Sequence, residues 1–375
     1  MAASQAGMRT GRLYFIDNLR IFLTVSVVVF HVAGVYLGFS REFPFVDPPT
    51  SNVTKALLRL FMIVNQAYFM GLFFFISGYF TPDSYDRKGS WVFIKDRLRM
   101  LGIPFLMYYF VLSPIAELSS VLADPTAQFS FNEYRNCLTS GPLWFAFMLL
   151  CFNFCYMLWR KTAHKVNMPI QINFTPSNIQ KVCVFMLVLA LVSYFFRIFA
   201  PAYHVFFLFP SFGYFPQYIS FFILGIIASR QDWLRSIPDS MGIQALVIAV
   251  LCSFVYFSVI LSSSSLSIEY FEGTAWQSCA LALWDSIFSV GFSLWLITIF
   301  RRFFNTQGNF TKFLQQQSFA VYVIHFPLIM YVAFFLHNAP LAHPLKCCLA
   351  ACLGVPLSFV AAYIIRKFPY VDRIL

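Results

Sequence analysis

Two polar side chains stand in the first long apolar segment of the chain, residues 13–37. Arg20 and His31 are eleven residues apart, and at about 100° per residue of α-helix this spacing is three turns plus about 20°. Both side chains are therefore expected on one face, about 16 Å apart along the axis. A guanidinium binds anionic groups, and an imidazole serves as a general base or a nucleophile. The pair predicts a substrate whose anionic part lies near Arg20 and whose reactive end reaches His31.

Each of these side chains also has a structural interpretation. His31 is compatible with a neutral imidazole bonded to a neighbouring helix, and Arg20 with an anchor that extends to the lipid headgroups. A charge inside a membrane span costs about 2.5–3.5 kcal/mol on insertion scales, so the shared face favours a function. Asp17, one turn before Arg20, either pairs with it and orients the guanidinium or caps the helix start.

A basic cluster precedes the third apolar segment. Arg97 and Arg99 flank Leu98, with Lys95 close by. Guanidinium groups hold phosphate through paired hydrogen bonds, so the cluster suits the pyrophosphate or ribose phosphate of coenzyme A. The structural alternative is a positively charged anchor on the cytoplasmic side of the membrane.

The ninth apolar segment carries a polar stripe. Ser318, Tyr322 and His325 are separated by four and then three residues, which places them on one helical face. Such a stripe should point inward, where His325 exchanges a proton or bonds the first segment. Helix packing is the alternative, above all for Tyr322.

Two further side chains need an explanation. Asp285 is an acid in the eighth apolar segment, and the sequence does not name its partner. Trp144 begins the fourth segment and is interpreted as an aromatic residue of the membrane interface, or as a stacking surface for a sugar at the outer mouth.

Membrane-spanning helices have to position all of these residues. Of 375 residues, 59% are hydrophobic and 11% charged, which excludes a water-soluble globular protein. Backbone groups in lipid must bond within their own segment, so the apolar stretches are helices. The predicted fold is all-α, a polytopic bundle of about ten transmembrane helices in the lipid bilayer. The predicted spans are residues 13–37, 57–80, 98–122, 143–160, 179–200, 215–229, 242–262, 278–300, 318–338 and 344–366.

The distribution of basic residues predicts the topology. The net charge of +11 is concentrated before the first span and after every second one, which indicates cytoplasmic N- and C-termini rather than a nucleic-acid partner. The first span is longer than the apolar region of a signal peptide and contains two charges, so it is expected to remain in place. We expect tails at residues 1–12 and 367–375 around one membrane domain, 13–366, in the plasma or inner membrane.

The nine cysteines do not show the paired spacing of metal ligands. Most lie in apolar segments, where cysteine behaves as a small apolar side chain. We therefore predict neither a bound metal nor a disulfide framework. The sequence does not specify an oligomeric state.

Several of these segments, in order, resemble motifs of the acyltransferase 3 family of multi-pass membrane acyltransferases. This family includes O-antigen O-acetyltransferases and the succinyltransferase of periplasmic glucans, and the compact form is similar to the glucan-modifying branch. The motifs cover nearly the whole chain. They are Phe15-Ile16-Asp17-Asn18-Leu19-Arg20 with His31, Phe73-Phe74-Phe75-Ile76-Ser77-Gly78, Arg97-Leu98-Arg99, Leu143-Trp144-Phe145, Phe222-Ile223-Leu224-Gly225-Ile226 and Tyr322-Val323-Ile324-His325-Phe326-Pro327.

The resemblance implies that an acetyl or succinyl group moves from cytoplasmic acyl-CoA to a hydroxyl of a glycan or glycolipid at the outer side. Acyl-CoA is then a donor substrate, and no tightly bound cofactor is expected. Catalysis is expected of His31 and Arg20. Substrate binding is expected of Arg97, Arg99, Asp17, Tyr322, His325 and Trp144.

Two other functions are compatible with the same residues. A secondary transporter or flippase for an anionic or lipid-linked solute would use His31 and Asp285 as proton-relay groups. The chain shows no internal repeat, which disfavours this reading. A non-catalytic membrane scaffold would use the buried polar residues for packing alone.

Overall fold

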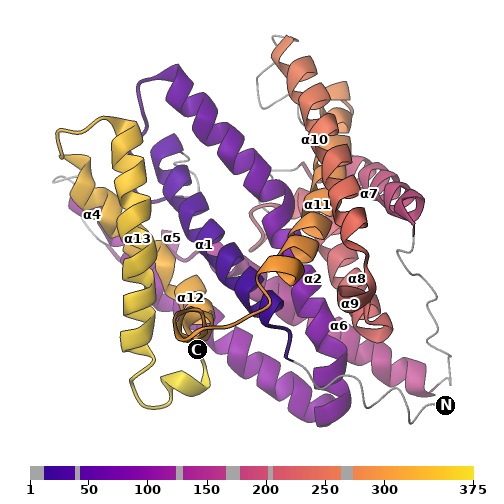
Figure 1. Cartoon of the computed structure of the whole chain (residues 1–375). Helices are drawn as coiled ribbons and strands as arrows, with labels where there is room; N and C mark the ends of the chain where they lie inside the picture. Colours follow the sequence, from indigo (N-terminus) through magenta and orange to yellow (C-terminus); the bar gives the residue numbers. More distant parts are fainter. Residues whose placement is uncertain (1–11, 39–42, 124–129, 166–177, 202–205, 263–272) are drawn as a thin grey trace.

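The computed structural model describes residues 12–38, 43–123, 130–165, 178–201, 206–262 and 273–375. These residues form a bundle of helices (Figure 1), and their one β-type contact is an isolated bridge between Phe206 and Phe209. The all-α prediction is confirmed. The α-helices are α1 (Tyr14–Leu37), α2 (Asn52–Arg97), α3 (Ile103–Met107), α4 (Ser113–Ala123), α5 (Phe131–Asn136), α6 (Trp144–Lys165), α7 (Ile179–Phe199), α8 (Phe215–Gln231), α9 (Trp233–Ser236), α10 (Asp239–Ser262), α11 (Trp276–Phe303), α12 (Asn309–His337) and α13 (His343–Ile365).

Nine helical stretches in the described residues are long and apolar enough to cross a membrane. The sequence predicted ten, and the difference lies in residues 52–123. There the second and third predicted spans form one helical run of 72 residues, which continues from α2 through two π-helical turns, Leu98–Gly102 and Tyr108–Leu112. The run is not one continuous helix, because Gly89 has a φ of 74° and a ψ of 168°, which are not helical, and two helices meet there at a kink. A positive φ is available to glycine without strain. The predicted spans 57–80 and 98–122 lie on either side of this kink.

Two glycines bring α2 and α8 into backbone contact. A Cβ atom on Gly78 would lie 2.2 Å from the carbonyl oxygen of Phe222, and one on Gly225 would lie 2.1 Å from that of Phe75. Small residues permit this approach in membrane helix pairs. The packing gives a physical reason for glycine in both of the motifs that contain these positions.

Helix α1 lies inside the bundle and contacts α2, α11, α12 and α13. Figure 1 shows it between the α12–α13 pair and α2. It ends at Gly38, which has a φ of 88° and whose N–H donates to the carbonyl of Gly34, a usual termination by a left-handed glycine. Because α1 is surrounded by these helices, its side chains project into the protein interior.

Candidate active site

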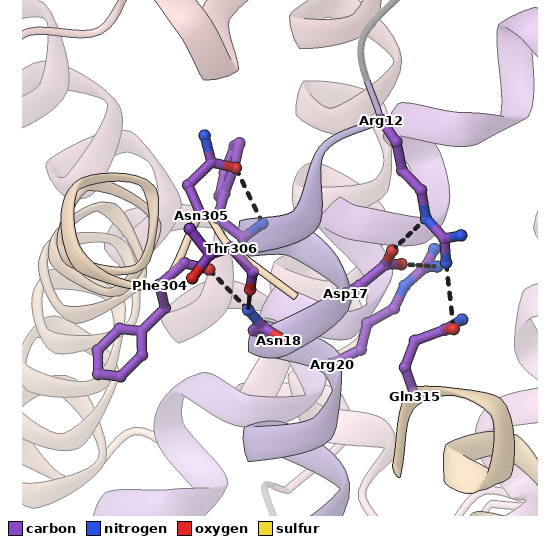
Figure 2. Close-up of polar contacts among 9 residues, drawn as sticks. Arg12, Asp17, Asn18, Arg20, Phe304, Asn305, Thr306 and Gln315 are labelled. Carbon is purple, nitrogen blue, oxygen red and sulfur yellow. Dashed lines mark hydrogen bonds and ion pairs between the residues drawn. The ribbon is translucent and has the colours of Figure 1, made fainter. Parts of the chain in front are cut away.

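Arg20 lies at the first end of α1 within a group of charged side chains. Its guanidinium stands 4.7 Å from the centre of the Phe80 ring, and one of its nitrogens is 4.0 Å from a carboxylate oxygen of Asp17. The other carboxylate oxygen of Asp17 accepts a hydrogen bond of 2.8 Å from Arg12, which also donates to Gln315 of α12 (Figure 2). The pairing predicted for Asp17 is present, with Arg12 as its closer partner.

The connection between α11 and α12 holds this end of α1 in place. Asn18 donates hydrogen bonds to the carbonyl oxygens of Phe304 at 2.7 Å and Thr306 at 2.9 Å. The backbone N–H of Phe15 donates to the side chain of Asn305 at 3.3 Å. These bonds converge on the first turns of α1 (Figure 2) and fix the direction in which Arg20 projects.

A cavity of about 250 Å³ opens beside Arg20. Its wall combines basic, acidic and aromatic side chains from α1, the middle of α2 and the start of α9. Such a cavity is large enough for a phosphate-sized group together with water. The lining residues are Arg12, Leu13, Asp17, Arg20, Tyr79, Phe80, Asp83, Asp232 and Arg235.

The two arginines of the basic cluster differ in their placement. Arg97 is partly buried at the end of α2, stands 5.1 Å from the Phe93 ring centre, and is close enough to Arg20 for the two charges to interact. Arg99 is exposed. The structure therefore brings Arg97 to the Arg20 region.

His31 meets His325 of α12 in the interior. The Nδ1 atom of His31 is 3.2 Å from Nε2 of His325, and the two ring centres are 5.0 Å apart. The same Nδ1 atom is 2.8 Å from the carbonyl oxygen of Val27. His325 is fully buried, and its Nδ1 is 2.8 Å from the carbonyl oxygen of Tyr322. His325 of the ninth predicted span is thus within hydrogen-bond distance of His31 in the first span.

The hydrogen-bond partners select the tautomers of both rings, because a carbonyl oxygen can only accept. Nδ1 of His325 must carry the proton that it donates to Tyr322, which leaves its Nε2 as an acceptor. Nδ1 of His31 then donates to that Nε2 and to Val27. The remaining nitrogen of His31, Nε2, consequently holds the free electron pair. This arrangement prepares His31 Nε2 as a base or a nucleophile, with His325 as the residue that orients it.

Aromatic rings enclose His31. The ring centres of Phe30, Phe43 and Phe326 lie 5.5, 6.0 and 5.5 Å from that of the imidazole. Apolar surroundings exclude water and strengthen the remaining hydrogen bonds. Arg20 therefore faces a polar cavity, whereas the partly exposed His31 lies among aromatic rings about three turns further along α1.

Tyr322 and Trp144 are both buried, and Tyr322 lies beside His325 of the pair His31–His325, which we call the dyad. The Tyr322 hydroxyl donates to the carbonyl of Pro142, in the 3₁₀ turn Gly141–Leu143 that precedes α6. Trp144 is only 8% exposed and packs against Tyr218, with ring centres 5.4 Å apart. The Trp144 indole therefore packs in the core of the bundle, not on its surface.

The partner of Asp285 is Arg197. A guanidinium nitrogen of Arg197 is 2.6 Å from a carboxylate oxygen of Asp285, and both side chains are 1% exposed. Arg197 also stands 4.6 Å from the ring centre of Tyr214. The ion pair joins α7 to α11 and uses the acid that the transporter interpretation required as a proton relay.

Comparison with known proteins identifies the family of the chain. The family model described as an acyltransferase domain, acyltransferase 3, matches residues 13–366. The chain belongs to the acyltransferase 3 family. It is accordingly a multi-pass membrane enzyme that transfers acyl groups other than aminoacyl groups.

Curated relatives carry the name glucans biosynthesis protein C. Those of Escherichia coli O6:K15:H31 (strain 536 / UPEC), O157:H7 and O81 (strain ED1a) are each 21% identical to this chain over 340 residues, which is 85% of this chain and 83% of theirs. No solved structure matches the chain.

Proposed function

We propose that this acyltransferase moves an acetyl or succinyl group from cytoplasmic acyl-CoA to a hydroxyl of a glycan or glycolipid on the outer side of the plasma or inner membrane. The contact between His31 and His325 carries the proposal, because it leaves one basic nitrogen of a partly buried imidazole free for chemistry. The name of the curated relatives supports a glucan as the acceptor.

The negative charges of the donor indicate where it binds. The cavity beside Arg20 receives the phosphate groups of CoA, where Arg12, Arg20 and Arg97 provide positive charge. His31 lies about 16 Å further along α1, a separation that the extended arm of CoA between its pyrophosphate and its thioester can cover. Arg99 assists from the exposed surface of the same segment.

The reaction follows from the tautomer of His31. Its Nε2 removes the proton of the acceptor hydroxyl as the oxygen attacks the thioester carbonyl. Collapse of the tetrahedral intermediate forms the ester, breaks the carbon–sulfur bond and returns the proton to the CoA thiolate. The positive charge that forms on His31 is shared through Nδ1–H with His325 and the carbonyl of Val27. The same nitrogen can instead attack the thioester first and pass the acyl group on from the imidazole.

Labelling separates these two routes. A labelled acyl-enzyme that is trapped in the parent and lost in His31→Ala supports the covalent route. Ternary-complex kinetics without a trapped species supports direct transfer.

Mass spectrometry of cellular glycans tests the proposal as a whole. Cells that lack the gene are complemented with the parent, His31→Ala, Arg20→Ala or the control Arg59→Ala, an exposed arginine at the start of α2. We expect the parent and Arg59→Ala to restore an acyl mass increment on a surface or periplasmic glycan. Restoration by His31→Ala and Arg20→Ala at equal protein levels would refute the proposal.

A further inference from the structure

The ring of Phe43 fills a recess directly beside the dyad. It lies 6.0 Å from the His31 ring centre and 5.5 Å from that of Phe326, and the side chain is only 3% exposed. A Cβ atom on Gly34 would lie 2.3 Å from Cζ of Phe43. The recess therefore exists because position 34 has no side chain, and it has the size of one six-membered ring.

The recess lies on the side of His31 that faces away from Arg20. Gly34 is one turn of α1 beyond His31, and Arg20 is three turns before it. The Arg20 end already has the polar cavity that suits the donor. An acceptor that receives the acyl group at His31 would therefore enter from the Gly34 end of α1, where the ring of Phe43 lies.

A charged cluster holds the segment 43–48, which carries Phe43. One carboxylate oxygen of Asp47 is 3.3 Å from Nδ1 of His337 and 3.5 Å from Nε2 of His343, and the other is 3.5 Å from Nζ of Lys346. The backbone N–H of Asp47 donates to the carbonyl of Val35 at 3.1 Å. We name Asp47, His337, His343 and Lys346 the Asp47 cluster. It ties segment 43–48 to the ends of α12 and α13.

Two buried polar groups lie next to this segment. The hydroxyl of Tyr36, which is 0% exposed, has no hydrogen-bond partner among the described residues, and Oδ2 of Asp47, whose residue is 5% exposed, has only the 3.5 Å ion-pair contact with Lys346. The two side chains are close enough to interact electrostatically. Buried polar atoms are nearly always satisfied, so this pair is suited to hydroxyl groups of a ligand that enters the segment's place. The long contacts within the Asp47 cluster also allow the segment to detach more easily than short hydrogen bonds would.

We propose that the ring of Phe43 occupies the place of one sugar ring of the acceptor, and that segment 43–48 swings out when the acceptor binds. This inference rests on the proposed acyl transfer and specifies the acceptor site. The apolar face of the sugar packs on Phe326, one hydroxyl faces Nε2 of His31, and others bond Tyr36 and Asp47. Until then, Phe43 covers one side of the partly exposed His31 ring and so limits the access of water to the thioester.

The experiment compares Phe43→Ala with Phe152→Ala in the full-length protein in nanodiscs. Phe152 is a similarly buried phenylalanine in a separate aromatic group with Phe74 and Phe222. Two quantities are measured: modification of His31 by diethyl pyrocarbonate, located by mass spectrometry, and CoA release from acetyl-CoA or succinyl-CoA without acceptor. We expect Phe43→Ala to raise both about tenfold, which corresponds to about 1.4 kcal/mol in the opening equilibrium. Phe152→Ala should change neither.

Asp47→Asn provides a second variant that leaves the aromatic packing intact. Removing the charge of the carboxylate weakens the Asp47 cluster, so both quantities should again rise. Parent values in both Phe43→Ala and Asp47→Asn would overturn the proposal. If His31 labelling rises in these variants while neither they nor the parent release CoA even after glycans extracted from cells that lack the gene are added, the closing role of Phe43 is upheld and the proposed acyl transfer is refuted.

Discussion

Replacement of His325 by alanine tests how the dyad works. The substitution removes the acceptor that lies 3.2 Å from Nδ1 of His31 and leaves the second acceptor, the Val27 carbonyl, in place. A hydrogen bond to a charged group contributes about 1.5–3 kcal/mol. One such bond to the His31 imidazolium is lost in the transition state, so kcat should fall about 10- to 150-fold. The KM for acyl-CoA should stay constant, because His325 does not contact the cavity beside Arg20.

The assay measures CoA release at saturating acyl-CoA with purified parent, His325→Ala, His325→Gln and His31→Ala. A glutamine places an amide oxygen near the position of the histidine Nε2 and can accept from His31, so His325→Gln should recover part of the loss. The thermal stability of each variant in detergent is measured as a control, because His325 is fully buried and its replacement can destabilise the protein. A parent-like kcat in His325→Ala, or equal losses in His325→Ala and His325→Gln at parental stability, would refute the role of His325 as the orienting acceptor.

Three further predictions concern stability. The first and third are measured by thermal unfolding in detergent, and the second is measured as the yield of folded protein. Asp285→Ala leaves the 1%-exposed guanidinium of Arg197 without its ion-pair partner and should lower the free energy of unfolding by about 3–5 kcal/mol; a change below about 1 kcal/mol would contradict the pairing. Gly225→Ala should reduce folded yield because its Cβ would meet backbone at 2.1 Å, whereas Gly102→Ala, with its nearest neighbours at 3.9 Å, should be tolerated; equal yields would contradict the close α2–α8 contact. Tyr322→Phe leaves the Pro142 carbonyl without its donor and should cost about 1–3 kcal/mol, and an unchanged midpoint would argue against this bond.

The sequence predicted the helices well because apolar length is a local property. Each of the ten predicted spans lies in helical structure, within a residue or two at the ends. The sequence did not predict that the charged residues between the second and third spans are helical, since charged residues between two apolar stretches are typical of a loop. They form helix on both sides of a kink at Gly89, where the backbone itself is not helical.

The candidate site could be predicted only in part. Arg20, His31 and His325 were selected because polar residues on apolar helices point inward. The sequence could not show which atoms of the two histidines are in contact, because His31 and His325 are 294 positions apart. The same holds for Arg197 and Asp285, which are 88 positions apart.

Two features of the site depend on the path of connecting segments. Trp144 is buried next to the 3₁₀ turn that precedes it, and segment 43–48 holds Phe43 6.0 Å from the His31 ring centre. Neither placement follows from hydropathy or from helical periodicity. Both depend on contacts between parts of the chain that are distant in sequence.

Acyl transfer from CoA by His31 is tested most directly by incubating the purified protein with labelled acetyl-CoA or succinyl-CoA and glycans extracted from cells that lack the gene. We expect equal amounts of CoA released and label transferred for the parent and for Arg59→Ala, and neither product above background for His31→Ala. Transfer by folded His31→Ala at the rate of the parent would contradict it.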